Sequence, residues 1–142
     1  MRPAFQRMPR YLLRLHQLGW APLQDIGDFV HWSPREYNCV ADCLANLAMD
    51  SKSDTESLDL PALHNTGNLR LCVDGGRRNE TSGGLGVAIY SYNAEADLGS
   101  RYRLLGRRST FLTRVSSAFV AETLAMESGL EFLLTILESI IT

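Results

Sequence analysis

The sequence feature that most constrains the fold is a short alternating segment followed by glycines. Across Leu69–Asp74 every second residue is apolar, which is the period of a half-buried β-strand. Gly75 and Gly76 follow directly, and this pair predicts a turn. A second glycine-rich segment, residues 83–86, leads into Val87–Tyr92, which we expect to be a second strand.

Further along, Arg101–Leu105 predicts a third strand. A long helix is expected to begin at Ser116 or Ser117, whose hydroxyls suit an N-cap, and to run to about Leu137. Strands that precede a long amphipathic helix indicate a sheet covered by a helix. The sequence therefore predicts an α/β or α+β fold.

The N-terminal third adds three more expected elements. Helical spacing of apolar residues covers Pro9–Leu18, a short strand is expected within Asp25–Trp32, and a second helix over Cys39–Met49 with Asn38 as its N-cap. Residues 51–68 are polar and lack periodicity, so we interpret them as a linker. Residues 1–50 and 69–142 would then form the two parts of one composite domain.

Composition sets limits on partners and compartment. The 142 residues suit one domain, and 14 basic against 16 acidic residues leave a net charge of -2. Three cysteines do not form a disulfide framework, so we expect an intracellular protein. The longest apolar stretch, Leu130–Ile141, is short and holds two glutamates, so no membrane span is expected.

Three acidic residues occupy positions that need an explanation. Asp74 ends an apolar strand, where from position alone an Asx turn is the simpler explanation. Glu122 shares a helix face with Ala125, Met126 and Gly129, although an early helix position alone favours an acid. Asp42 lies in the first turn of its helix, where it complements the helix dipole. Carboxylates with few histidines suit Mg²⁺, which prefers oxygen ligands.

Two strings in the chain resemble one family, ribonuclease H type 1. The first resembles the family's last strand, loop and C-terminal helix, and the second resembles its first strand, glycine-rich hairpin and first helix. The first string consists of His31–Asn38, Ala41-Asp42 and Leu44–Ala48, and the second of Leu71–Gly76, Gly83–Tyr90, Ser117–Glu122, Ala125 and Gly129-Leu130.

The resemblance implies an RNase H-like mixed sheet flanked by helices and a metal-dependent endonuclease that cleaves the RNA strand of RNA–DNA hybrids. Asp74 matches the metal-binding aspartate of the family's first strand, Glu122 the glutamate of its first helix, and Asp42 the aspartate of its last helix. The implied cofactor is Mg²⁺, with Mn²⁺ as the alternative. His31 matches the family's loop histidine poorly, and a structural role is the simpler interpretation.

The chain departs from the family in the order of its elements. The C-terminal string precedes the N-terminal one, and the family's fourth strand, with its own aspartate, is found at neither end. Either the chain spans the junction of two head-to-tail units, or it is a circular permutant. The missing strand would leave Leu69–Asp74 at an open sheet edge, which invites a second copy or a partner strand.

Arginines predict where nucleic acid would bind. The 14 residues from Arg101 to Arg114 hold five arginines and no acid, a composition that suits phosphate contact and equally a solubilised edge strand. The residues expected to contact nucleic acid are Gly75, Gly76, Arg77, Arg78, Asn79, Arg107 and Arg108. Two other functions remain open: a catalytically impaired nucleic-acid-binding domain, and a non-functional fragment of a tandem or retroelement-derived gene.

Overall fold

The computed structural model describes residues 38–59, 68–92, 95, 97 and 102–141. The helix expected over Pro9–Leu18, the strand expected within Asp25–Trp32 and His31 lie outside these residues. The described elements are α2 (Cys39–Ser51), β1 (Thr55–Leu58), β2 (Asn68–Asn79), β3 (Ser82–Tyr92), β4 (Tyr102–Leu112) and α4 (Ala118–Ile141).

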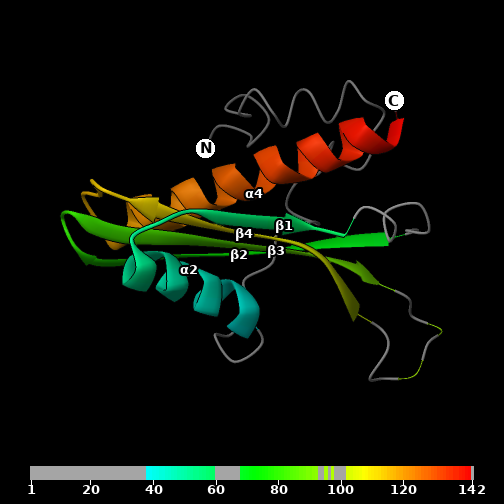
Figure 1. Ribbon diagram of the computed structural model, residues 1–142, viewed down its shortest axis with the longest axis horizontal. Helices are drawn as coiled ribbons and strands as arrows, with labels where there is room; N and C mark the ends of the chain where they lie inside the picture. Colours follow the sequence, from blue (N-terminus) through cyan, green and yellow to red (C-terminus); the bar gives the residue numbers. More distant parts are fainter. Residues whose placement is uncertain (1–37, 60–67, 93–94, 96, 98–101, 142) are drawn as a thin grey trace, which may run out of the picture.

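The four strands form one open sheet in the order β1-β4-β3-β2, and each neighbouring pair is antiparallel. The two helices cover opposite faces of this sheet, with α4 on one side and α2 on the other (Figure 1). This arrangement confirms the expected combination of one sheet with helices packed on it. A mixed sheet was expected, whereas the pairings among the described residues are all antiparallel.

The expected turn at Gly75-Gly76 is wrong, because both glycines lie within β2 and pair with β3. The chain instead reverses at Glu80-Thr81, where the Asn79 side-chain oxygen accepts hydrogen bonds from the Thr81 N–H and hydroxyl. The glycines serve close packing. A side chain at Gly75 would overlap the backbone of α4 at Ala121.

The structure also differs from the sequence prediction within residues 51–68, which were interpreted as a linker. Thr55–Leu58 forms the edge strand β1, paired with residues 106–109 of β4. Its first three residues are exposed, so the segment carries no apolar signal from which a strand could be recognised. Backbone pairing and polar side-chain contacts with β4 hold it in place.

The two helices begin close to the predicted residues. The Ser117 hydroxyl accepts a hydrogen bond from the Val120 N–H at 3.1 Å, so Ser117 caps α4 as expected. Asn38 precedes α2 but makes no side-chain cap. Its amide instead donates a hydrogen bond to the Val73 carbonyl of β2 at 2.7 Å. Asn38 therefore ties the start of α2 to the sheet.

The two faces of the sheet pack differently. On the α4 face, Val87, Ile89 and Leu105 meet Phe132 and Ile136 in the main apolar core. On the α2 face, glycines of β3 lie directly beneath the helix backbone. A side chain at Gly86 would overlap the Ala41 carbonyl, and one at Gly84 would overlap the Ala45 carbonyl. The helix α2 therefore sits closer to the sheet than bulky side chains would allow.

Candidate functional site

The candidate site is centred on residues 73–76 of β2. In the described sheet, β2 has one neighbour, β3, and Asp74 pairs with Gly86. Because successive side chains of a strand point to opposite faces, Val73 and Gly75, which meet α4, place Asp74 on the α2 face. Asp74 is half-buried there.

Glu122 lies beside this segment on the other face of the sheet. A side-chain carbon at Gly75 would lie 2.7 Å from the Glu122 backbone nitrogen, so the two backbones are in direct contact. Glu122 shares a side of α4 with Gly129, seven residues on, which packs against Val73 and Leu71. The Glu122 side chain is exposed, at the rim of the α4 packing against β2.

Asp42 belongs to the side of α2 that faces β2. Asn38 and Met49 both contact β2, through the Val73 carbonyl and beside Gly76. Asp42 is four residues after Asn38 and seven before Met49, spacings that place all three on one side of a helix. The Asp42 side chain is half-buried. It therefore lies on the same face of the sheet as Asp74.

The structure thus brings the three predicted carboxylate positions to one short segment of β2: Asp42 and Asp74 on the α2 face, and Glu122 across the strand. Among residues 38–59, 68–92, 95, 97 and 102–141, no group of three or more His, Cys, Asp or Glu side chains is arranged to hold a metal ion. The ligand roles of these residues therefore stay predictions.

Several of the predicted nucleic-acid contacts have partners within the protein. The Arg77 Nε–H donates to the Val115 carbonyl at 3.0 Å, and Arg78 forms an ion pair with Asp50 at 2.7 Å. Arg107 donates to the Ser57 hydroxyl of β1 at 2.9 Å. Asn79 shapes the hairpin turn. Arg77, Arg78 and Arg107 are nevertheless exposed and keep donors on the surface.

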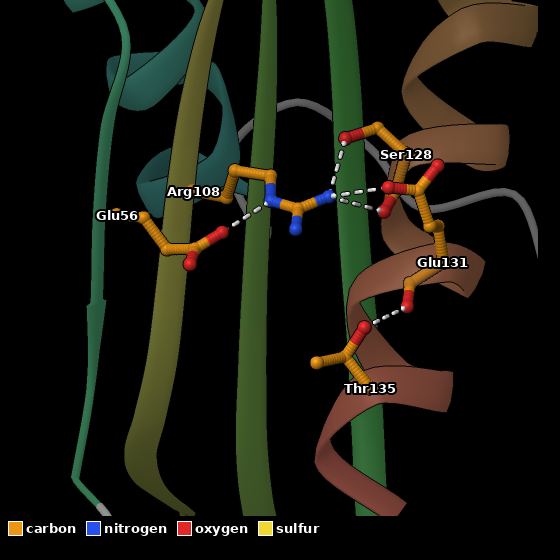
Figure 2. A network of polar contacts seen from close by, with 5 residues as sticks. All are labelled: Glu56, Arg108, Ser128, Glu131 and Thr135. Atoms are coloured by element: carbon orange, nitrogen blue, oxygen red, sulfur yellow. Dashed lines mark hydrogen bonds and ion pairs between the residues drawn. The ribbon is translucent and has the colours of Figure 1, made fainter. Parts of the chain in front are cut away.

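Arg108 is the most enclosed of these arginines, with 18% of its side chain exposed. Figure 2 shows its guanidinium between β1 and α4. It pairs with Glu56 at 2.7 Å and with Glu131 at 3.7 Å, donates to the Ser128 carbonyl, and lies 4.6 Å above the centre of the Phe132 ring. These contacts join the edge strand, the sheet and the helix, so Arg108 acts chiefly as an internal tie.

A hollow of about 530 Å³ lies beside this tie, between β1, β4 and α4. Its lining includes four acids, Asp54, Glu56, Glu127 and Glu131, with Arg108 as its single basic residue. A phosphate backbone would be repelled by this charge. The hollow is also on the opposite face from Asp74, so we exclude it from the candidate nucleic-acid site.

A group of residues that sequence patterns did not single out lies on the Asp74 face. Arg70, Tyr90 and Tyr102 come from three neighbouring strands, and Tyr102 contacts both Arg70 and Tyr90. Burial raises the pKa of the Tyr90 phenol above its ordinary value, with the Cys72 and Cys39 thiols acting in the same direction. The alternation of β2 places Arg70 on the Asp74 face. Tyr90 and Tyr102 reach the same face through the pairing of β3 with β2 and β4, which local sequence patterns do not specify.

Comparison with models of protein families, with curated proteins and with solved structures finds no match to this chain. No helix in the part of the chain that the structure describes is long and apolar enough to cross a membrane.

Proposed function

We propose that the protein is a metal-dependent endonuclease that cleaves the RNA strand of RNA–DNA hybrids, built on an RNase H-like fold with its elements in permuted order. One observation carries the proposal: residues 73–76 of β2 contact both helices, α2 on the side that bears Asp42 and α4 beside Glu122. Three carboxylates that are distant in sequence therefore lie around the middle of a single strand.

The arrangement of elements supports the proposed fold. Three consecutive antiparallel strands followed by a long helix match the resemblance of the second string to a first strand, hairpin and first helix. The helix α2, which carries Ala41-Asp42 and Leu44–Ala48 of the first string, covers the opposite face. In this proposal α2 occupies the position of the family's C-terminal helix although it comes first in the chain.

The chemistry of the donors suits Mg²⁺, because Asp42, Asp74 and Glu122 offer only carboxylate oxygens. These three residues would hold the ion, and the chemistry that it would supply is activation of water and stabilisation of the leaving oxygen in phosphodiester cleavage. Asn38 fixes α2 against β2 through the Val73 carbonyl, next to Asp74. It would thereby hold Asp42 in position.

The second candidate is a domain that binds nucleic acid without cutting it. It is favoured by the absence of a three-carboxylate group among the described residues. Both functions require Arg77 and Arg78 at the surface near Gly76, where they would contact phosphates. Cleavage is the property that separates the two.

The test is cleavage of a labelled RNA–DNA hybrid with Mg²⁺ or Mn²⁺ by the wild-type chain and by Asp74→Asn, Glu122→Gln and Glu127→Gln. Glu127 is an exposed acid of the same helix, outside the β2-facing side, and serves as the matched control. We expect metal-dependent cleavage that is lost in Asp74→Asn and Glu122→Gln and retained in Glu127→Gln.

Hybrid binding without cleavage, weakening steeply as salt is raised, would contradict the enzyme and support the binding domain. Neither cleavage nor binding by a chain that unfolds cooperatively would contradict both functions. A chain without a cooperative unfolding transition would instead support the fragment hypothesis.

A further inference from the structure

A tyrosine–arginine cluster, defined as Arg70, Tyr90 and Tyr102, crosses three strands at one end of the sheet. Arg70 of β2 pairs directly with Tyr90 of β3. The two tyrosine rings meet edge to face with centres 6.1 Å apart. The Arg70 guanidinium lies 5.3 Å from the centre of the Tyr102 ring and donates a hydrogen bond to the Tyr102 hydroxyl.

The cluster is accessible. Tyr102 is 45% exposed, Arg70 is exposed, and Tyr90 is half-buried. Tyrosine and arginine planes at this exposure leave apolar, polarisable surface in contact with water. Tyr102 contacts both of the other residues, and Arg70 and Tyr90 are paired in the sheet, so the surface is ordered before any ligand arrives.

The charge around the cluster favours an anion. On this face the strands also carry Arg107, which pairs with Ala88 in register, and the single acid on this face of the four described strands is Asp74. Asp74 is four residues along β2 from Arg70, about 13 Å at the rise of a strand. A negatively charged polymer would therefore meet arginines first at this end of the sheet.

We propose that the tyrosine–arginine cluster binds an unpaired base of single-stranded nucleic acid. Bases that are not in a duplex stack on tyrosine rings and on guanidinium planes. The cluster presents both, and Arg70 adds a positive charge for the adjoining phosphate. A nucleic-acid strand held here would lie on the same face of β2 as Asp74.

This inference does not depend on cleavage, because its test measures binding alone. The experiment uses the full chain and fluorescence anisotropy with three labelled probes of equal length: an oligouridylate, an oligothymidylate and an abasic oligonucleotide. The abasic probe carries the same phosphates without bases. The difference between probes therefore reports the stacking contribution separately from charge.

The variants are Tyr102→Ala, Arg70→Gln and a matched control, Arg103→Gln. Arg103 neighbours Tyr102 in β4, is exposed, and pairs with Asp59 outside the cluster. Arg70→Gln and Arg103→Gln each remove one positive charge from the same end of the sheet. A purely electrostatic effect of either variant would be of the same size with the abasic and the base-bearing probes.

We expect the wild-type chain to bind the oligouridylate more tightly than the abasic probe. Tyr102→Ala should weaken binding of the oligouridylate by about 5- to 100-fold and leave the abasic probe nearly unchanged. Arg70→Gln should weaken binding of the oligouridylate more than binding of the abasic probe, whereas any effect of Arg103→Gln should be the same for both probes. A similar response with the oligothymidylate would show that the cluster reads the base and not the sugar.

Equal affinity of the wild-type chain for the abasic and the base-bearing probes would overturn the proposal. Should Tyr102→Ala fail to unfold cooperatively, Tyr102→Phe and Arg70→Gln provide the test. The first keeps the ring and is expected to retain most base-dependent binding, whereas the second is not.

Discussion

The two faces of the sheet are covered by helices that are held in opposite ways. Beneath α4, large side chains such as Phe132 and Ile89 fill the space between helix and strands. Beneath α2, Gly84 and Gly86 have no side chains to separate the helix from the sheet, so the helix backbone packs directly against β3. One interface is therefore sensitive to losing volume, and the other to gaining it.

The difference has a consequence for the candidate site. Asp42 is carried by the closely packed helix and Glu122 by the helix on the bulky core. The distance between α2 and the sheet is set by backbone contact, which allows little adjustment. The position of Asp42 should therefore depend on glycines that bear no chemistry of their own.

The largest expected effect is on the bulky face. Phe132 is 2% exposed and is the largest fully buried side chain of the described core. Phe132→Ala should lower the free energy of unfolding by about 3–5 kcal/mol, because it leaves a cavity and removes the ring beneath Arg108. Urea denaturation measures this change. A loss below about 1 kcal/mol would contradict the assignment of this face as the main core.

The second effect tests the closely packed face. Gly86→Ala should cost about 2–3 kcal/mol in unfolding free energy, since the new methyl group overlaps the Ala41 carbonyl and α2 has to move. Gly76→Ala is the matched control in the neighbouring strand, where the methyl group would meet only the flexible end of Met49 at 3.2 Å. Equal losses in the two variants would show that backbone contact does not position α2.

The third prediction concerns the hydrogen bond by which Asn38 joins α2 to β2. Asn38→Ala removes the hydrogen bond to the Val73 carbonyl and should cost about 1 kcal/mol of stability. Asn46→Ala in the same helix removes an exposed local hydrogen bond and should change stability much less. If the enzyme proposal holds, Asn38→Ala should also slow hybrid cleavage more than Asn46→Ala. Equal losses of stability in Asn38→Ala and Asn46→Ala would contradict a stabilising role for the hydrogen bond between Asn38 and Val73.

The smallest expected effect is a decline in stability at alkaline pH. Burial raises the pKa of the Cys72 thiol above its ordinary value of 9.0, with Arg70 acting in the opposite direction. Above pH 9 the unfolded chain loses this proton before the folded chain does, so stability falls as pH rises. Comparing urea unfolding at pH 8 and pH 10 in the wild type and Cys72→Ala measures the contribution. A decline of the same size in both would contradict it.

Local patterns predicted the elements whose signals are local. The alternation before Asp74, the Ser117 cap and the helix after Asn38 all occur where the sequence placed them. Gly75 was misinterpreted because a turn and a close helix approach both require glycine, and only the position of α4 separates them. Thr55–Leu58 escaped prediction because its stability comes from β4, about 50 residues away.

The candidate site could be predicted only in part, for a similar physical reason. Spacing within a helix shows which side carries Asp42 or Glu122, but not which strand that side meets. Asn38 illustrates the limit. Its residue type favours a helix cap, but its side chain donates a hydrogen bond to the Val73 carbonyl, 35 residues away. The tyrosine–arginine cluster likewise depends on cross-strand register, which no local pattern specifies.

The attachment of α2 and β1 to the rest of the molecule has a further consequence. These elements precede residue 60, and they reach the other elements through noncovalent contacts: Asn38 with Val73, the Ser109 hydroxyl with the Leu44 carbonyl, and the ladder between β1 and β4. A chain cut once between β1 and β2 should therefore behave as two complementary pieces that associate again through these contacts, as the halves of a split protein do.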